Sequence, residues 1–154
     1  MKNFKIFLII FLIIISCNYN NKNNSISKIK DRAGNDIIIP KKIEKIICLS
    51  PSITEILIEI EEEDKIISVD SYSKEILEKN NISTSNMQIF DMMNPDVEKI
   101  ISLKPDIIFV NTFSVFSAKN SVDAIKNLGL SVAVIPNSDT LIAIEEDIYF
   151  LGEV

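Results

Sequence analysis

The side chains best suited to chemistry in this chain are hydroxyl and amide groups that follow short apolar runs. Four such segments can be read directly: Ser50-Pro51-Ser52, Asp70-Ser71-Tyr72-Ser73, Asn111-Thr112-Phe113-Ser114 and Pro136-Asn137-Ser138. They combine a few hydrogen-bonding groups with two aromatic rings, which is the mixture that small-molecule sites use. The same residue types are common in ordinary turns, so composition leaves a binding site and plain loops as equal alternatives.

Catalysis is not favoured by the residue types present. The chain has no histidine, so neither a Ser/His/Asp triad nor a Cys/His pair can be built. Its three glycines are too few for a dinucleotide or phosphate-binding loop. Carboxylates gather at residues 59–64, at the end of an expected helix, and are interpreted as solvated surface. We therefore expect no enzymatic activity, no cofactor and no metal held by protein ligands.

The two cysteines have different predicted roles. Cys17 follows two early lysines, ten apolar residues (6–15) and Ser16, a pattern that resembles the lipobox of bacterial lipoproteins. In those proteins the cysteine is lipidated and becomes the new N-terminus; a plain signal peptide and an uncleaved anchor are the alternatives. Cys48 lies inside the apolar run 46–49 and is predicted to be a buried strand residue.

These features divide the chain into three parts. Residues 1–16 are predicted to be a lipoprotein signal peptide, residues 17–26 a lipidated flexible tether, and residues 27–154 one folded domain. Without residues 1–16, which carry two lysines and no acid, 14 basic side chains face 22 acidic ones. A net charge of −8 argues against nucleic acid as a partner. We expect an exported protein that Cys17 anchors to the cell membrane, at the periplasmic or outer surface.

The order of apolar runs predicts an α/β domain with a parallel sheet flanked by helices, preceded by a β-hairpin at residues 28–39. Strands are expected at 45–49, 65–69, 106–110 and 131–135. Helices are expected at 52–60, 95–103, 118–128 and from 138 onward, with a short one at 74–79. Helix boundaries are predicted from a Ser52–Glu55 capping box, from Asn94 before Pro95, and from Gly129 as a terminating glycine.

Taken in order, several stretches resemble the substrate-binding proteins of ABC importers for iron–siderophores, haem and cobalamin. The stretches are residues 29–40 (IKDRAGNDIIIP), 45–57 (KIICLSPSITEIL), 64–69 (DKIISV) and 94–108 (NPDVEKIISLKPDII). The resemblance implies the N-terminal lobe of a class III periplasmic-binding-protein fold, in which one long helix joins two lobes. Family members run to about twice this length, so the resemblance implies a chain that stops inside the interlobe helix.

The resemblance also implies particular site residues. The ligand-facing positions fall on Ser52, Tyr72, Phe90 and the segment Asn111, Thr112 and Phe113. A separate position, Glu98, corresponds to the glutamate with which this family docks onto its permease. Without the resemblance, Glu98 would be interpreted as a solvated acid in the first turn of a helix.

Two functions from different classes follow as expectations. The first is a lipid-anchored, apparently truncated substrate-binding component of an ABC importer, which binds a metal chelate and delivers it to permease and ATPase subunits. The second is an orphan or decayed surface lipoprotein without transport activity. A related group that binds bare zinc or manganese needs histidine ligands, and this chain has none.

Overall fold

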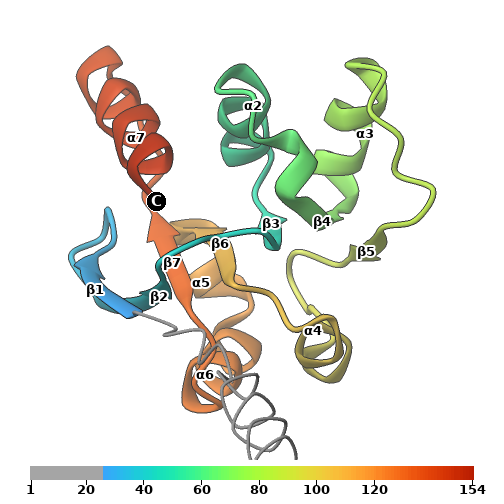
Figure 1. The fold of residues 1–154 in the computed structure, drawn as a ribbon. Coiled ribbons are helices and arrows are strands. Elements are labelled where there is room, and N and C mark those ends of the chain that lie inside the picture. The colour runs from blue at the N-terminus through green and yellow to red at the C-terminus, as the bar shows by residue number, and fades with distance from the viewer. Residues whose placement is uncertain (1–25) are drawn as a thin grey trace, which may run out of the picture.

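The structure of the protein is a computed structural model that describes residues 26–154 (Figure 1). Its strands are β1 (Ile26–Lys30), β2 (Asp36–Pro40), β3 (Ile46–Leu49), β4 (Ile66–Asp70), β5 (Gln88–Phe90), β6 (Ile107–Asn111) and β7 (Val132–Ile135). Its helices are α2 (Pro51–Glu59), α3 (Ser71–Lys79), α4 (Val97–Leu103), α5 (Thr112–Ser117), α6 (Lys119–Asn127) and α7 (Leu141–Glu153), with a 3-10 turn η1 (Glu63–Lys65). Within this range no helix is both long and apolar enough to cross a bilayer.

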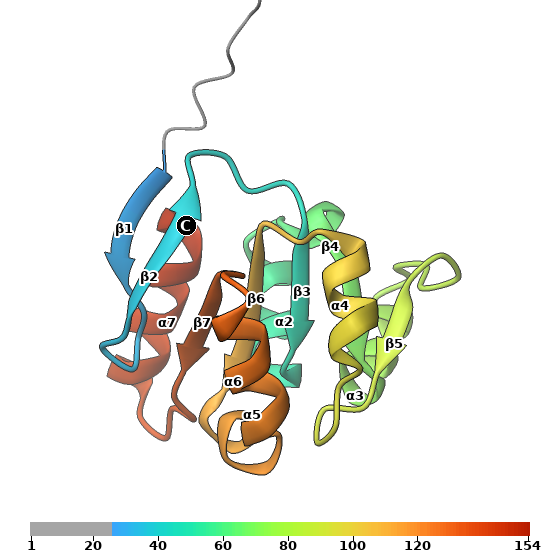
Figure 2. The ribbon, with the colours of Figure 1, turned by 90° about the horizontal axis from the view of Figure 1, so that it is seen from below.

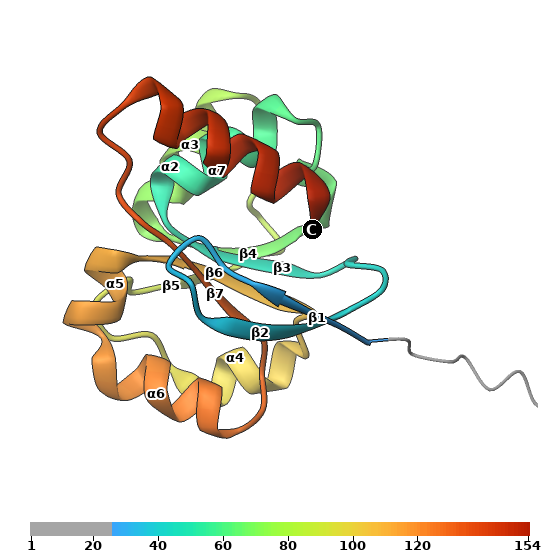
Figure 3. The ribbon, with the colours of Figure 1, turned by 90° about the vertical axis from the view of Figure 1, so that its left-hand side faces the viewer.

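Five parallel strands form the main sheet in the order β5-β4-β3-β6-β7. All five run in the same direction in Figure 2, with the β1–β2 hairpin beside β7. Helices α2, α3 and α7 cover one face of the sheet, and α4, α5 and α6 cover the other (Figure 3). The predicted α/β architecture with an N-terminal hairpin is confirmed.

The core consists of two apolar layers, one on each face of the sheet. Successive side chains of a strand point to opposite faces. In β3, Ile46 and Cys48 therefore belong to the layer under α2, α3 and α7, while Ile47 and Leu49 belong to the layer against α4 and α6. The central strands are buried on both faces, so their sequences read as unbroken apolar runs rather than alternating ones.

Side chains, rather than a shared ladder, attach the hairpin to the rest of the domain. The carboxylate of Asp31, only 5% exposed, accepts hydrogen bonds from Ala33 N and Asn35 N within the turn. Its second oxygen accepts from Val134 N at 2.9 Å, on the edge strand β7. Arg32 Nε donates to Asp147 Oδ1 on α7 at 2.7 Å. The turn of the hairpin is thus tied to both the sheet and α7.

The Arg32 contact is a largely buried ion pair. Asp147 is 3% exposed, and it also accepts a 2.5 Å hydrogen bond from Ser138 Oγ. A second carboxylate, Glu146, lies 2.7 Å from Arg32 on the solvent side. The hydrogen bond to Asp147 is the main cause that raises the pKa of Arg32 above its usual value, so this side chain is a permanent cation. Removing either partner would leave the other charge poorly satisfied.

Two of the predicted helix boundaries are wrong, and one is confirmed. Helix α2 begins at Pro51, and Ser50 precedes it without a side-chain cap, so the predicted Ser52–Glu55 box does not form. Helix α4 is capped by Asp96, which accepts from Lys99 N at 3.1 Å, instead of by Asn94. Gly129 follows α6 with φ +81°, as expected of a glycine that ends a helix.

Candidate functional site

The strand order places a topological switch point between β3 and β6. From β3 the chain moves outward to β4 and β5, and it then crosses back to β6 and β7. In open parallel sheets such a point leaves a crevice outside the carboxyl ends of the strands, where ligands bind. Five segments meet at this edge, and we call them the carboxyl-edge rim: residues 50–53, 70–73, 91–94, 111–114 and 136–139.

A hydrogen bond spans the switch point. Asn111 Nδ2, at the end of β6, donates to Ser50 Oγ, just after β3, at 3.2 Å. Ser50 Oγ also lies 3.3 Å from Ser52 Oγ. Two of the segments singled out from the sequence therefore come together through their own side chains, although 61 residues separate Ser50 from Asn111.

Asn111 is oriented by the start of α5. Its Oδ1 accepts from Ser114 N at 2.7 Å and lies 3.0 Å from Ser114 Oγ. With the carbonyl oxygen committed and one amide hydrogen directed at Ser50, the second amide hydrogen is left for another acceptor. Asn111 is half-buried, so a bound molecule could supply that acceptor.

Most of the predicted ligand-facing side chains are accessible on the rim. Tyr72 is 61% exposed in the first turn of α3, and Phe113 is 43% exposed in the first turn of α5. Ser52 and Thr112 are exposed as well. The rim thus offers two aromatic rings, hydroxyl groups and one oriented amide, a set that can hold a flat polar molecule but supplies no strong base.

Phe90 does not belong to this surface, which corrects the prediction for that residue. It is only 3% exposed and packs in the apolar layer with Ile100 and Val122. The physical reason is the strand β5, which pairs with β4 and directs the side chain of Phe90 into the core. Two exposed apolar residues near the rim were missed: Met93, 54% exposed, and Phe116, 85% exposed, three residues after Phe113 on the unpredicted helix α5.

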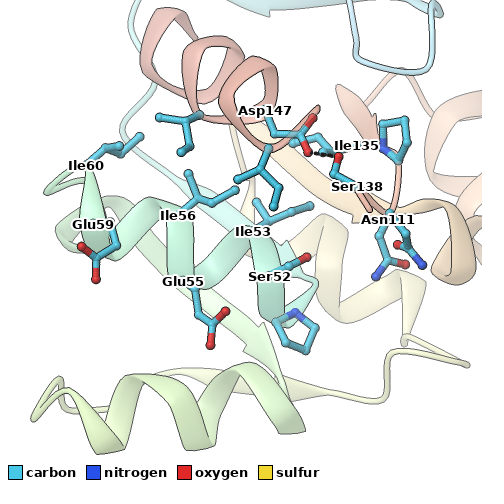
Figure 4. A pocket seen from close by; sticks show the side chains of 15 residues that line it. Ser52, Ile53, Glu55, Ile56, Glu59, Ile60, Asn111, Ile135, Ser138 and Asp147 are labelled. Atoms are coloured by element: carbon cyan, nitrogen blue, oxygen red, sulfur yellow. Dashed lines mark hydrogen bonds between the residues drawn. The ribbon is translucent and has the colours of Figure 1, made fainter. Parts of the chain in front are cut away.

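A groove of about 770 Å³ continues from the rim between α2 and α7. Ser52, Asn111 and Ser138 line its polar end, and the rest is lined mainly by isoleucines, together with the carboxylates Glu55, Glu59 and Asp147. Ile53 and Ile56 point from α2 toward α7, whereas Glu55 and Glu59 point away from it (Figure 4). This groove could not be predicted from the residue pattern, because it depends on how α7 packs beside α2.

The remaining reactive groups do not add chemistry to the rim. Among residues 26–154, no three metal-binding side chains lie close enough together to hold an ion. Cys48 is fully buried, and this burial is the main cause that raises the pKa of its thiol to about 12, despite a 3.2 Å hydrogen bond from Thr54 Oγ1. Glu98 is exposed in the first turn of α4, on the opposite face of the sheet from α2. Cys17 lies outside the described residues.

Comparisons with known proteins agree with this geometry. The uncharacterized ABC transporter substrate-binding lipoprotein YvrC of Bacillus subtilis (strain 168) is 30% identical over 128 residues, which make up 81% of this chain and 38% of that protein. A possible iron-binding (periplasmic solute-binding) protein of Staphylococcus epidermidis shares 25% identity with a TM-score of 0.64, over 73% of this chain and 42% of its own. A periplasmic solute binding protein of Veillonella parvula shares 22% identity with a TM-score of 0.67, over 84% and 40%.

The chain therefore spans well under half the length of the relatives that it matches. The family model described as periplasmic binding protein matches residues 46–154, from the start of β3 to the end of the chain. That match includes all five strands of the main sheet and every segment of the carboxyl-edge rim. The chain belongs to the periplasmic binding protein family.

Proposed function

We propose that this chain is the ligand-binding lobe of an ABC importer's substrate-binding lipoprotein, and that its ligand is a metal chelate of the siderophore, haem or cobalamin kind. The observation that carries the proposal is the hydrogen bond from Asn111 to Ser50 across the switch point, with Tyr72 and Phe113 exposed on the same rim. Relatives with transport and iron-binding descriptions support it.

In this proposal the rim holds the ligand by shape and stacking. Tyr72 and Phe113 present ring faces to a flat chelate, while Ser52, Thr112 and the second amide hydrogen of Asn111 bond to its polar edge. The lobe forms one wall of the site, and the part of such receptors that lies outside the matched span would form the facing wall. Lipidation of Cys17 would hold the lobe beside its permease.

Removing the aromatic rings is the direct test. Calorimetric titration of the full chain in lipid nanodiscs, with a ferric trihydroxamate, haem and a cobalamin as probes, is expected to give at least one dissociation constant below about 1 mM. Changing both Tyr72 and Phe113 to alanine is expected to weaken that binding about tenfold, because each stacked ring contributes about 0.5–1.5 kcal/mol.

Tyr149→Ala serves as the matched control for this test, because Tyr149 is 67% exposed and lies on α7 outside the rim. We expect the Tyr149→Ala variant to bind the probe with the same affinity as the unaltered chain. Absence of binding by all three probes would contradict the proposed function. Equal weakening by Tyr149→Ala would place the ligand elsewhere.

We also propose that Glu98 docks the lobe onto the permease. An exposed carboxylate can meet a guanidinium in a bidentate pair, which fixes orientation as well as affinity. Glu98→Arg is expected to leave the ligand dissociation constant within about twofold, but to reduce stimulation of the cognate importer's ATPase in proteoliposomes about tenfold or more. Glu75→Arg, an exposed change on α3, should keep full stimulation. Full stimulation by Glu98→Arg would rule out the docking role.

A further inference from the structure

The carboxyl-edge rim carries no positively charged side chain. None of its five segments contains lysine or arginine, and the chain has no histidine. The rim does contain carboxylates: Asp91 and Asp139 are exposed, and Asp70 is buried beneath the surface. The lysines that flank the strands stand at the opposite edge of the sheet, for example Lys45 before β3 and Lys65 before β4.

Neighbouring lysines on the helices already have acidic partners. Lys74 Nζ lies 2.7 Å from Glu78 on α3, and Lys119 Nζ lies 2.5 Å from Asp123 on α6. Each ammonium is therefore paired with a carboxylate one turn further along the chain. Neither lysine supplies an uncompensated cation to a ligand held there.

At two of the helix N-termini on the rim, protein side chains already occupy the N–H groups that would attract an anion. A helix start attracts negative charge through its free N–H groups. Here the Asp70 carboxylate accepts from Tyr72 N and Ser73 N at the start of α3. Asn111 caps α5 in the same way. Helix α2 has no side-chain cap, and its first residue, Pro51, has no N–H, so α2 begins with one donor fewer than the other two helices.

We infer that this lobe selects neutral or positively charged chelates and rejects those with an anionic periphery. This inference rests on the proposed function and names the ligand class for the same site. Ferric tricatecholates, with three negative charges, and porphyrins bearing two propionates would meet the exposed carboxylates Asp91 and Asp139 without any compensating cation. Ferric trihydroxamates are neutral or carry a free ammonium arm. Neither they nor corrinoids would be repelled by these carboxylates.

A matched pair of probes isolates charge from shape. A ferric trihydroxamate with a free amine arm and the same chelate with a succinylated arm differ by two charges around one iron centre. Titrated against the full chain in nanodiscs at about 0.05 M salt, the cationic form is expected to bind about tenfold tighter, because charges within roughly 8 Å at a partly solvated edge interact appreciably. At about 0.5 M salt, the ratio of the two dissociation constants should become smaller, because salt screens the charges.

Variants then assign the effect to the rim. Asp139→Lys is expected to raise the affinity for the succinylated probe about fivefold. Asp64→Lys, a change at another exposed position, in η1 at the amino edge of the sheet, should leave the affinity for the succinylated probe unaltered. Equal binding of both probes, or tighter binding of the anionic one, would overturn the charge selection while the proposed function stands. Failure of both probes, of haem and of a cobalamin to bind would instead contradict the proposed function itself.

Discussion

Asp31→Ala is expected to lower the free energy of unfolding by about 3 kcal/mol, because each buried donor left without an acceptor costs about 1–3 kcal/mol. The lost carboxylate accepts from Val134 N on the edge of the sheet and from two backbone groups in the hairpin turn. No water can reach the Val134 amide easily, since β7 is fully buried. Urea unfolding followed by far-UV circular dichroism measures the change.

Two variants of the same hairpin make this result specific. Asp31→Asn keeps one side-chain oxygen and is expected to lose about half as much stability. Asp36→Ala removes an exposed carboxylate that pairs with Lys28 and Lys30 at the surface, so the unfolding midpoint of this variant should stay close to that of the unaltered chain. If Asp31→Ala and Asp36→Ala unfold at the same urea concentration, the side-chain attachment described above is wrong.

Cys48 is expected to react with an alkylating reagent at pH 8 at least about a thousandfold more slowly in the native chain than in urea. Only the thiolate reacts, and a pKa near 12 in place of 9.0 lowers the thiolate fraction by about three powers of ten. Burial slows the reaction further. A Cys17→Ser background leaves Cys48 as the single thiol, and mass spectrometry follows the modification. Ser71→Cys, at an exposed position on α3, should label rapidly; fast labelling of Cys48 would contradict its burial.

The same thiol makes stability depend on alkaline pH. In the unfolded chain Cys48 loses its proton near pH 9.0, while the folded state holds it until about 12. The unfolded state therefore binds fewer protons in this window, and stability falls as pH rises, by about 1.4 kcal/mol per pH unit above 9. Below pH 9 the contribution is fully present. Urea titrations at pH 8 and pH 10 should show a smaller loss in Cys48→Ala than in the unaltered chain.

The long buried strands and their flanking helices could be predicted from the sequence, because a parallel sheet covered on both faces leaves unbroken runs such as residues 46–49 and 107–110. The edge strand β5 could not, since Gln88–Phe90 is only three residues long and gains its conformation from pairing with β4. Helix α5 could not be predicted either, because Thr112–Ser117 is short and rich in hydroxyl groups that favour turns.

The candidate site could also be predicted only in part from the sequence. Asn111 and Ser52 could be placed at one edge because the carboxyl ends of parallel strands must meet there. The burial of Phe90 could not be predicted, because the resemblance indicates its position along the chain but not which face of the short strand β5 its side chain occupies. The α2–α7 groove could not be predicted for a further reason. In the sequence, its isoleucines cannot be distinguished from ordinary core residues unless the separation of the two helices is known.

The hairpin has a mechanical consequence. Its strands pair Ile26 with Pro40, so the chain enters and leaves the hairpin at the same end. A pull arriving from residue 25 would open the β1–β2 ladder one hydrogen bond at a time, a geometry that yields at low force. The turn at the other end of the hairpin resists such a pull, because Asp31 and Arg32 are hydrogen-bonded to β7 and α7. Separation of the two strands would therefore stop at the turn, and β1 would extend before any tension applied at residue 25 reached the rim.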